Sequence, residues 1–177
     1  MIDLIRDLDV EFARDPAGPG VVRLLARFAA EGTAWREYVH FCNGAYARNL
    51  VHGSERYELM VICWNAGETS PVHDHAGQRC WMATLEGAIQ ETLFDLPFAP
   101  GSPLSARPPR LLHPGDVAFI TDEHALHEIR PAGDEPAVSL HLYAQPIRRC
   151  NLYDPVTGAV EPRQLSYHSI GGRLQVS

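Results

Sequence analysis

The sequence contains no lysine, and all fifteen of its basic residues are arginines. Twenty-two acidic residues outnumber them, so the formal net charge is -7. No segment concentrates the arginines into a basic patch, and an acidic balance argues against a protein that binds nucleic acid. We attribute the absence of lysine to codon bias and expect no nucleic-acid partner.

The chain also lacks an apolar run long enough to cross a membrane. Its first segment, MIDLIRDLDVEFARDP, is too charged for a signal peptide, so we expect a cytoplasmic protein that does not contact a membrane. The cysteines form no C-x-x-C pair, and in a reducing compartment free thiols are expected. The four cysteines are Cys42, Cys63, Cys80 and Cys150.

Internal repeats, heptads and glycine-rich phosphate loops are absent as well. A length of 177 residues with 45% hydrophobic residues suits a single domain with one sizeable core. No long apolar face is left over for a partner subunit, and we therefore expect one domain over residues 1–177 that works as a monomer.

Residues 1 to about 43 have helical patterns. The segment DLIRDLDVEFARD places apolar residues at helical spacings, and VVRLLARFAAEG forms a second amphipathic segment that stops at Gly32. Thr33 is positioned to cap a third helix, AWREYVHFC. We expect these short helices to pack on the rest of the domain.

Residues from about 44 to 177 have the pattern of a β-protein. Short segments rich in strand formers alternate with Gly, Pro and Asp turns, at a spacing typical of a sandwich or barrel. The Pro-rich stretch 97–110 is predicted to be an exposed excursion. The predicted strand segments are YELMVICWNAG, RCWMATLEG, IQETLFDL, DVAFITD, HALHEIRPAG, AVSLHLYAQP and CNLYDP.

Residues 71–80, PVHDHAGQRC, contain two histidines one residue apart. Alternate residues of a strand point the same way, so His73 and His75 are expected to project together, with Asp74 turned aside. An H-x-H pair alone is as consistent with surface histidines as with a metal site.

In AVSLHLYA, Ser139, His141 and Tyr143 occupy every second position. On a strand they share one face, and the opposite face is apolar. Burying three polar side chains costs free energy unless they bond one another or a ligand. This alternation therefore indicates a functional face.

The surroundings of the H-x-H pair resemble the cupin signature, in which two histidines, a glutamate and a later histidine hold a metal. GETSPVHDHAGQRCWMATLEG matches its glycines, Gly67 and Gly87, and both histidines, but Cys80 occupies the position of the glutamate. Three neutral imidazoles would leave a divalent iron with its full charge. Such a site suits a substrate that brings its own anionic ligand, such as a thiolate.

Within the cupins, the chain resembles the cysteine dioxygenases, the branch with three histidines and iron, from about residue 44 to about residue 170. The segments that carry this resemblance are YARNLV, CWNAGETSPVHDH, RCW, EGAIQETLFDLP, ALHEI and EPAVSLHLYAQP. The resemblance implies a cupin-type jelly-roll barrel. It also implies an iron(II) enzyme that uses O2 as co-substrate to convert L-cysteine to cysteine sulfinate in cysteine catabolism.

The resemblance assigns roles to individual residues. It implies iron binding by His73, His75 and His127, binding of the substrate carboxylate by Arg48 beside Tyr46, and a packing position for Trp64 at the pocket. It places Tyr143 near the substrate, with a relay from Ser139 through His141 to its hydroxyl. It also implies a thioether between Cys80 and Tyr143 in many members.

Several alternatives remain open at this point. His124 competes with His127 as the third ligand, although ALH matches the family. The substrate could be another small thiol acid such as 3-mercaptopropionate, but members that prefer it carry glutamine at the position of Arg48. A metal-binding cupin without catalysis is a further alternative, and it would need neither Cys80 nor the Ser-His-Tyr face.

Overall fold

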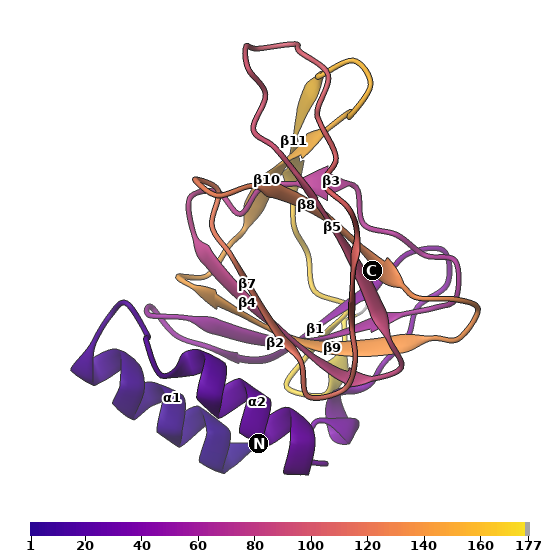
Figure 1. The fold of residues 1–177 in the computed structure, drawn as a ribbon. Helices are drawn as coiled ribbons and strands as arrows, with labels where there is room; N and C mark the ends of the chain where they lie inside the picture. Colours follow the sequence, from indigo (N-terminus) through magenta and orange to yellow (C-terminus); the bar gives the residue numbers. More distant parts are fainter. Residues whose placement is uncertain (176–177) are drawn as a thin grey trace.

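The computed structural model describes residues 1–175, and in it two β-sheets face each other while two helices cover the outside of one sheet (Figure 1). The helices are α1 (Ile2–Arg14) and α2 (Val21–Glu31), followed by a 3-10 turn, η1 (Arg36–Tyr38). The strands are β1 (Ala47–Gly53), β2 (Glu58–Trp64), β3 (Val72–His73), β4 (Arg79–Glu86), β5 (Ile89–Phe94), β6 (Arg110–Leu112), β7 (Val117–Ile120), β8 (Leu126–Pro131), β9 (Ala137–Ala144), β10 (Arg149–Tyr153), β11 (Val160–Gln164), β12 (Ser169–Ile170) and β13 (Arg173–Leu174).

The larger sheet has seven strands in the order β13-β12-β1-β2-β9-β4-β7, and the smaller has six in the order β11-β10-β3-β8-β5-β6. Neighbouring strands are antiparallel except for the parallel pair β1 and β12. Because the chain passes repeatedly from one sheet to the other, the arrangement is a jelly roll. This confirms the predicted cupin-type fold, but the strands form two sheets and not one closed barrel.

Strand β9 divides two regions of the core. Its apolar residues Val138, Leu140 and Leu142 face the helices, whereas Ala137 and Tyr143 belong to the cluster between the sheets. Every residue of β9 is buried, so both faces of this central strand are covered. The predicted apolar face and polar face are therefore both present, and the polar face lies inside the molecule.

The first two predicted helices are confirmed. Leu8 of α1 and Leu25 of α2 are fully buried beneath the larger sheet, and the ring of Phe12 stacks on Tyr57 with centroids 5.2 Å apart. Gly32 ends α2 in an extended conformation, as its position predicted. The helices thus cover the outer face of the larger sheet, and the polar face of its central strand β9 points to the other side, between the sheets.

The predicted third helix is wrong, because AWREYVHFC forms only the single turn η1. Asparagine side chains on or next to the larger sheet donate hydrogen bonds to backbone carbonyl groups of this segment, which are then not available for helical hydrogen bonds. Asn49 Nδ2 donates to the carbonyl of His40 at 3.0 Å, and Asn65 Nδ2 donates to that of Cys42 at 2.7 Å. These long-range hydrogen bonds hold the chain extended toward β1.

Each predicted strand segment contains a strand, and residues 97–110 form the predicted excursion between β5 and β6 (Figure 1). The missed strands lack an alternating pattern. The residues of β11, for example, are all exposed, and β3 spans only Val72–His73. Within residues 1–175, no helix is long and apolar enough to span a membrane.

Candidate metal centre and the adjoining cavity

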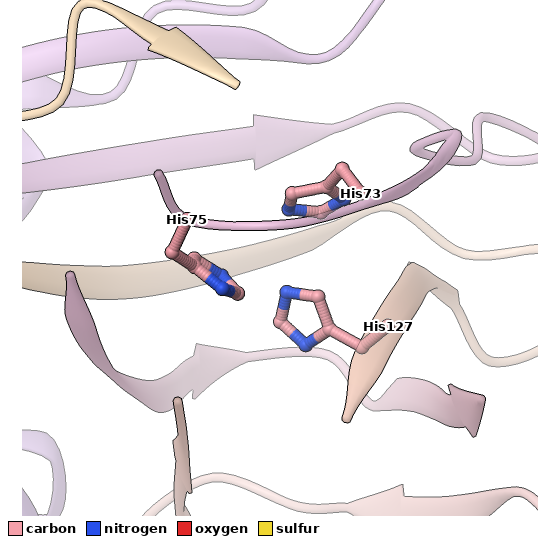
Figure 2. Close-up of side chains that lie close together, drawn as sticks. All are labelled: His73, His75 and His127. Atoms are coloured by element: carbon pink, nitrogen blue, oxygen red, sulfur yellow. The ribbon is translucent and has the colours of Figure 1, made fainter. Parts of the chain in front are cut away.

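Three histidines, two on strands of the smaller sheet and one just after a strand, meet between the sheets. His73 on β3 is the register partner of His127 on β8, and His75 follows just after β3 ends. Their ring centroids lie 4.6–5.3 Å apart, and one potential ligand atom from each lies within 4.8 Å of the others. Figure 2 shows the rings turned toward one another. We refer to these three residues as the histidine cluster.

Two members of the cluster are oriented through their Nδ1 atoms. His73 Nδ1 lies 2.9 Å from the carbonyl oxygen of Pro71, and His75 Nδ1 lies 3.2 Å from Asp122 Oδ1. Asp122 also accepts hydrogen bonds from the backbone amides of His75 and Gly77, at 2.7 and 2.6 Å. Since the acceptors hold the Nδ1 protons, the Nε2 lone pairs remain for another partner.

His127 is oriented in the same way by a buried carboxylate. Its Nδ1 lies 2.8 Å from Glu91 Oε1, and the other oxygen of Glu91 accepts hydrogen bonds from Arg110. Burial raises the pKa of Glu91, while Arg110 opposes that shift. A carboxylate behind a histidine is a common arrangement behind metal ligands, because it fixes both the tautomer and the ring.

The histidine cluster fits a divalent metal. His75 Nε2 is buried and has no hydrogen-bond partner within residues 1–175, which is costly for a polar atom unless a ligand satisfies it. Burial lowers the pKa values of His73 and His127 well below the usual range, so both are neutral, as metal ligation requires. The donor set is three imidazole nitrogens with no carboxylate among them.

His124, the competing third ligand, lies outside the cluster. It is exposed, and Arg107 Nη2 donates to its backbone carbonyl at 3.3 Å. Asp74 also turns aside as expected, since its carboxylate accepts hydrogen bonds from Asn151 and Tyr153. The position of His127 opposite His73 therefore selects it over His124.

The polar face of β9 is a connected chain of hydrogen bonds. Trp64 Nε1 donates to Ser139 Oγ at 2.9 Å, and that oxygen lies 2.9 Å from His141 Nε2. His141 Nδ1 lies 3.3 Å from the hydroxyl of Tyr143. Because an indole N–H can only donate, Ser139 accepts from Trp64 and can donate a hydrogen bond to His141 Nε2, and His141 Nδ1–H then faces Tyr143.

Cys80 and Tyr143 face each other across neighbouring strands. They are register partners in β4 and β9, and both side chains are buried in the cluster between the sheets. Burial raises the pKa of both groups, so the thiol and the phenol are protonated at neutral pH. Trp81, the next residue after Cys80, points to the opposite side and packs with the helices, as predicted.

A cavity of about 680 Å³ adjoins the histidine cluster, and His73 forms part of its lining. Arg48 lies in its wall with only 7% of its surface exposed. Its Nη1 donates to the Ser166 carbonyl at 3.3 Å, whereas its buried Nη2 has no hydrogen-bond partner within residues 1–175. The cavity side chains that the sequence predicted are Tyr46, Arg48, Trp64, His73, His141 and Tyr143.

Tyr46 and Trp64 form an aromatic part of this wall. Their rings stack with centroids 4.7 Å apart, and burial raises the pKa of Tyr46. The structure thus brings all the predicted site residues to one region, with the histidine cluster, the β9 face and Arg48 around a single space.

Sequence reasoning missed the carboxylates behind the site. Glu91 had a detectable signal, because it shares a strand face with the fully buried Ile89, where a carboxylate needs a partner. Asp122 had none, since it lies in a polar turn after β7. Glu58, fully buried on β2 next to Arg48, was missed because its partners are far away in the sequence and meet it only in the folded chain.

Comparison with known proteins agrees with this geometry. Human cysteine dioxygenase type 1 is 34% identical over 96% of this chain and 86% of its own length, and the rat protein is 35% identical over the same shares. A solved Klebsiella pneumoniae protein with a double-stranded β-helix domain is 17% identical, with a TM-score of 0.51 over 73% of this chain and 86% of its own, and it supports the fold alone. The family model for cysteine dioxygenase type I matches residues 1–156, and the chain belongs to that family.

Proposed function

We propose that this protein is a non-haem iron(II) dioxygenase that converts L-cysteine and O2 to cysteine sulfinate. The observation that carries the proposal is the histidine cluster with no carboxylate ligand, next to a cavity where Arg48 has an unpaired, buried N–H. The first feature suits a substrate that supplies a thiolate, and the second suits a substrate that carries a carboxylate. Cysteine has both groups. Family membership supports the same reaction.

His73, His75 and His127 would hold the iron through their Nε2 atoms. When bound, the iron supplies the redox chemistry that allows O2 to react with a thiol sulfur. Burial lowers the pKa values of His73 and His127 and keeps both neutral, and Pro71, Asp122 and Glu91 fix the tautomers of the three imidazoles. Because no ligand carries a negative charge, the centre retains its attraction for an anionic sulfur.

Arg48 would bind the carboxylate of cysteine. A guanidinium can donate two parallel N–H bonds to a carboxylate, and in a buried wall such a pair is poorly screened. Tyr46, stacked on Trp64, borders the same space. The carboxylate contact would fix the substrate so that its sulfur faces the histidine cluster.

Tyr143 would aim its hydroxyl at the bound substrate. When Ser139, which accepts from Trp64 Nε1, donates its own hydroxyl proton to His141 Nε2, His141 Nδ1–H can donate to the oxygen of Tyr143. The phenol therefore keeps its own proton for a group in the cavity. Burial lowers the pKa of His141 well below the usual range, so His141 stays a neutral donor in this chain.

Cys80 would form a thioether with the Tyr143 ring carbon beside the hydroxyl. The new C–S bond replaces one S–H and one C–H bond, and the two electrons and two protons pass to O2. The position of Cys80 directly opposite Tyr143 in the neighbouring strand supports this step. The link would hold the ring in one rotamer and so keep its hydroxyl aimed at the substrate.

We further propose a single domain over residues 1–177, acting as a cytoplasmic monomer without nucleic-acid or membrane partners. The shared core of the helices and the larger sheet supports the first part, because α1 and α2 bury their apolar faces against it. Sedimentation at micromolar concentrations would measure the oligomeric state.

The test is anaerobic addition of L-cysteine to the iron(II)-loaded protein, followed by admission of O2. We expect consumption of one O2 per cysteine and formation of the sulfinate, measured with an oxygen electrode and mass spectrometry. The matched substrate is 3-mercaptopropionate, which lacks the amine. Preferential oxidation of 3-mercaptopropionate would mean that this acid, and not cysteine, is the substrate. If neither thiol caused O2 uptake, the protein would be a metal-binding cupin without dioxygenase activity.

A further inference from the structure

Glu58 is a buried carboxylate beside the cavity, outside the histidine cluster and the β9 chain. It lies on β2, and its side chain is completely buried. Its oxygens accept hydrogen bonds from Arg148 Nη1 at 2.6 Å, from the Tyr167 hydroxyl at 2.5 Å and from the Ile147 amide at 3.2 Å. A buried carboxylate needs such partners, because an unpaired one would be strongly destabilising.

Two arginines compete for this carboxylate, and they are placed differently. Arg148 is hydrogen-bonded to Glu58 Oε2, whereas Arg48 Nη2 lies 3.7 Å from Oε1, beyond hydrogen-bonding distance. Both guanidinium groups lie over the Tyr167 ring, each 5.4 Å from its centroid. The hydrogen bond to Glu58 is also the main cause of a raised pKa for Arg148.

The charges of this group leave one cation in excess. Glu58 contributes one negative charge, and Arg148 and Arg48 contribute one positive charge each. Because Arg148 makes the hydrogen bond to Glu58, Arg48 Nη2 keeps an N–H without a hydrogen-bond partner. Without Arg148, the nearest cation to Glu58 would be Arg48.

We propose that Arg148 is a positioning residue for substrate binding: by occupying Glu58, it keeps Arg48 free for the carboxylate of the substrate. This inference rests on the proposed function, in which Arg48 binds that carboxylate. Arg148 itself is largely exposed and belongs to the segment between β9 and β10, so it acts through Glu58 and not by touching the substrate.

The test compares Arg148→Gln with Arg149→Gln, a matched control. Arg149 is the adjacent exposed arginine, and its side chain has no hydrogen bond or ion pair within the described residues 1–175. Anaerobic calorimetric titration of the iron(II) protein would give dissociation constants for cysteine and for cysteamine, which has the thiol and amine but no carboxylate. Oxygen uptake with cysteine would separate KM from kcat.

We expect Arg148→Gln to weaken cysteine binding on the order of tenfold, because Glu58 then competes with the substrate for Arg48. In Arg148→Gln, the dissociation constant for cysteamine and the kcat with cysteine should be unchanged. In Arg149→Gln, the dissociation constants for both thiols should be unchanged. Adding Glu58→Gln to Arg148→Gln should restore cysteine binding, because the competitor is then uncharged. Arg148→Lys keeps a cation beside Glu58 and should bind cysteine nearly as the unmodified protein does, which provides a second measurement if Arg148→Gln folds poorly.

Three results would overturn the inference: unchanged cysteine binding in Arg148→Gln, equal weakening of cysteine and cysteamine, or no restoration in the double variant. Equal weakening would indicate a purely structural role for Arg148. If Arg148→Gln does not fold, weak cysteine binding in Arg148→Lys also contradicts the inference. Failure of the unmodified protein to bind cysteine at all would instead refute the proposed function, so the two failures are distinguishable.

Discussion

Cys80 and Tyr143 are register partners on adjacent antiparallel strands, and both side chains are buried between the two sheets. Directly opposed residues have Cβ atoms about 4.5–5.5 Å apart, which brings a thiol next to the ring of its partner. The fold therefore brings the thiol and the phenol together without any rearrangement of the backbone.

Turnover with iron, cysteine and O2 should join Cys80 to Tyr143. Intact-mass analysis should show a species lighter by two hydrogens, and digestion should yield one peptide that joins the segments around both residues. The species should be absent in Cys80→Ala and Tyr143→Phe but present in Cys63→Ala, since Cys63 is buried among the residues that pack toward the helices. Cys80→Ala should keep part of its activity, because the iron ligands remain. An unlinked chain after many turnovers would contradict the assignment.

His127→Ala should lose iron, whereas His124→Ala should retain it. Removing one of three ligands should weaken iron binding by at least the roughly 10–100-fold that is typical when a group behind the ligands is lost. Metal analysis after dialysis against a chelator measures the difference. Loss of iron from His124→Ala alone would show that the exposed histidine, and not the one opposite His73, completes the site.

Asp122→Asn should weaken iron binding by roughly 10–100-fold, because the amide cannot accept from His75 and from the Gly77 amide at the same time. Glu123→Gln is the matched control, since it removes the adjacent, exposed carboxylate. Burial alone would raise the pKa of Asp122, but hydrogen bonds from His75 and Gly77 outweigh it and hold the pKa below its usual value. Equal iron affinities in both variants would remove Asp122 from the account of the metal centre.

Arg48→Ala should weaken cysteine binding by about 2–5 kcal/mol, the usual cost of losing one partner of a buried charge-assisted pair. The binding free energy of cysteamine should fall much less, since cysteamine has no carboxylate. The measurement is anaerobic titration of the iron(II) protein with each thiol. Equal losses for the two thiols would mean that Arg48 supports the cavity wall and does not bind the carboxylate.

The H-x-H pair of His73 and His75 could be predicted from sequence because its spacing is local and matches a known signature. The same holds for the face of β9, where strict alternation over eight residues fixes which side chains share a side. Helices α1 and α2 were predictable from their apolar periodicity. In each of these cases, neighbours along the chain carry the information.

Features that depend on distant segments could not be predicted. AWREYVHFC has a helical pattern, but Asn49 and Asn65 from the sheet capture its carbonyl groups. Glu58 gains its role only when Arg148 and Tyr167, from two later loops, reach it. No local pattern specifies such contacts, because each is formed by tertiary packing between segments far apart in the sequence.

The two glycines of the signature should differ in their sensitivity to substitution. Both adopt positive φ, 78° for Gly67 and 72° for Gly87. A Cβ at Gly67 would meet nothing within 4 Å, whereas one at Gly87 would lie 2.5 Å from the backbone oxygen of Pro136. Gly67→Ala should therefore cost only the left-handed strain of about 1 kcal/mol, and Gly87→Ala should add an overpacking cost for a total of roughly 3 kcal/mol.

For a chain of this size, about 1 kcal/mol corresponds to a shift of roughly 2–4 °C in Tm. Gly67→Ala should thus lower Tm by about 2–4 °C and Gly87→Ala by about 6–12 °C, measured by calorimetry on the metal-free proteins so that iron binding does not contribute. The backbone of Pro136 lies next to β9, which packs on both sides and cannot yield without disturbing the core. Equal shifts in Tm would mean that this segment moves aside freely and that Gly87 is required only for its backbone conformation.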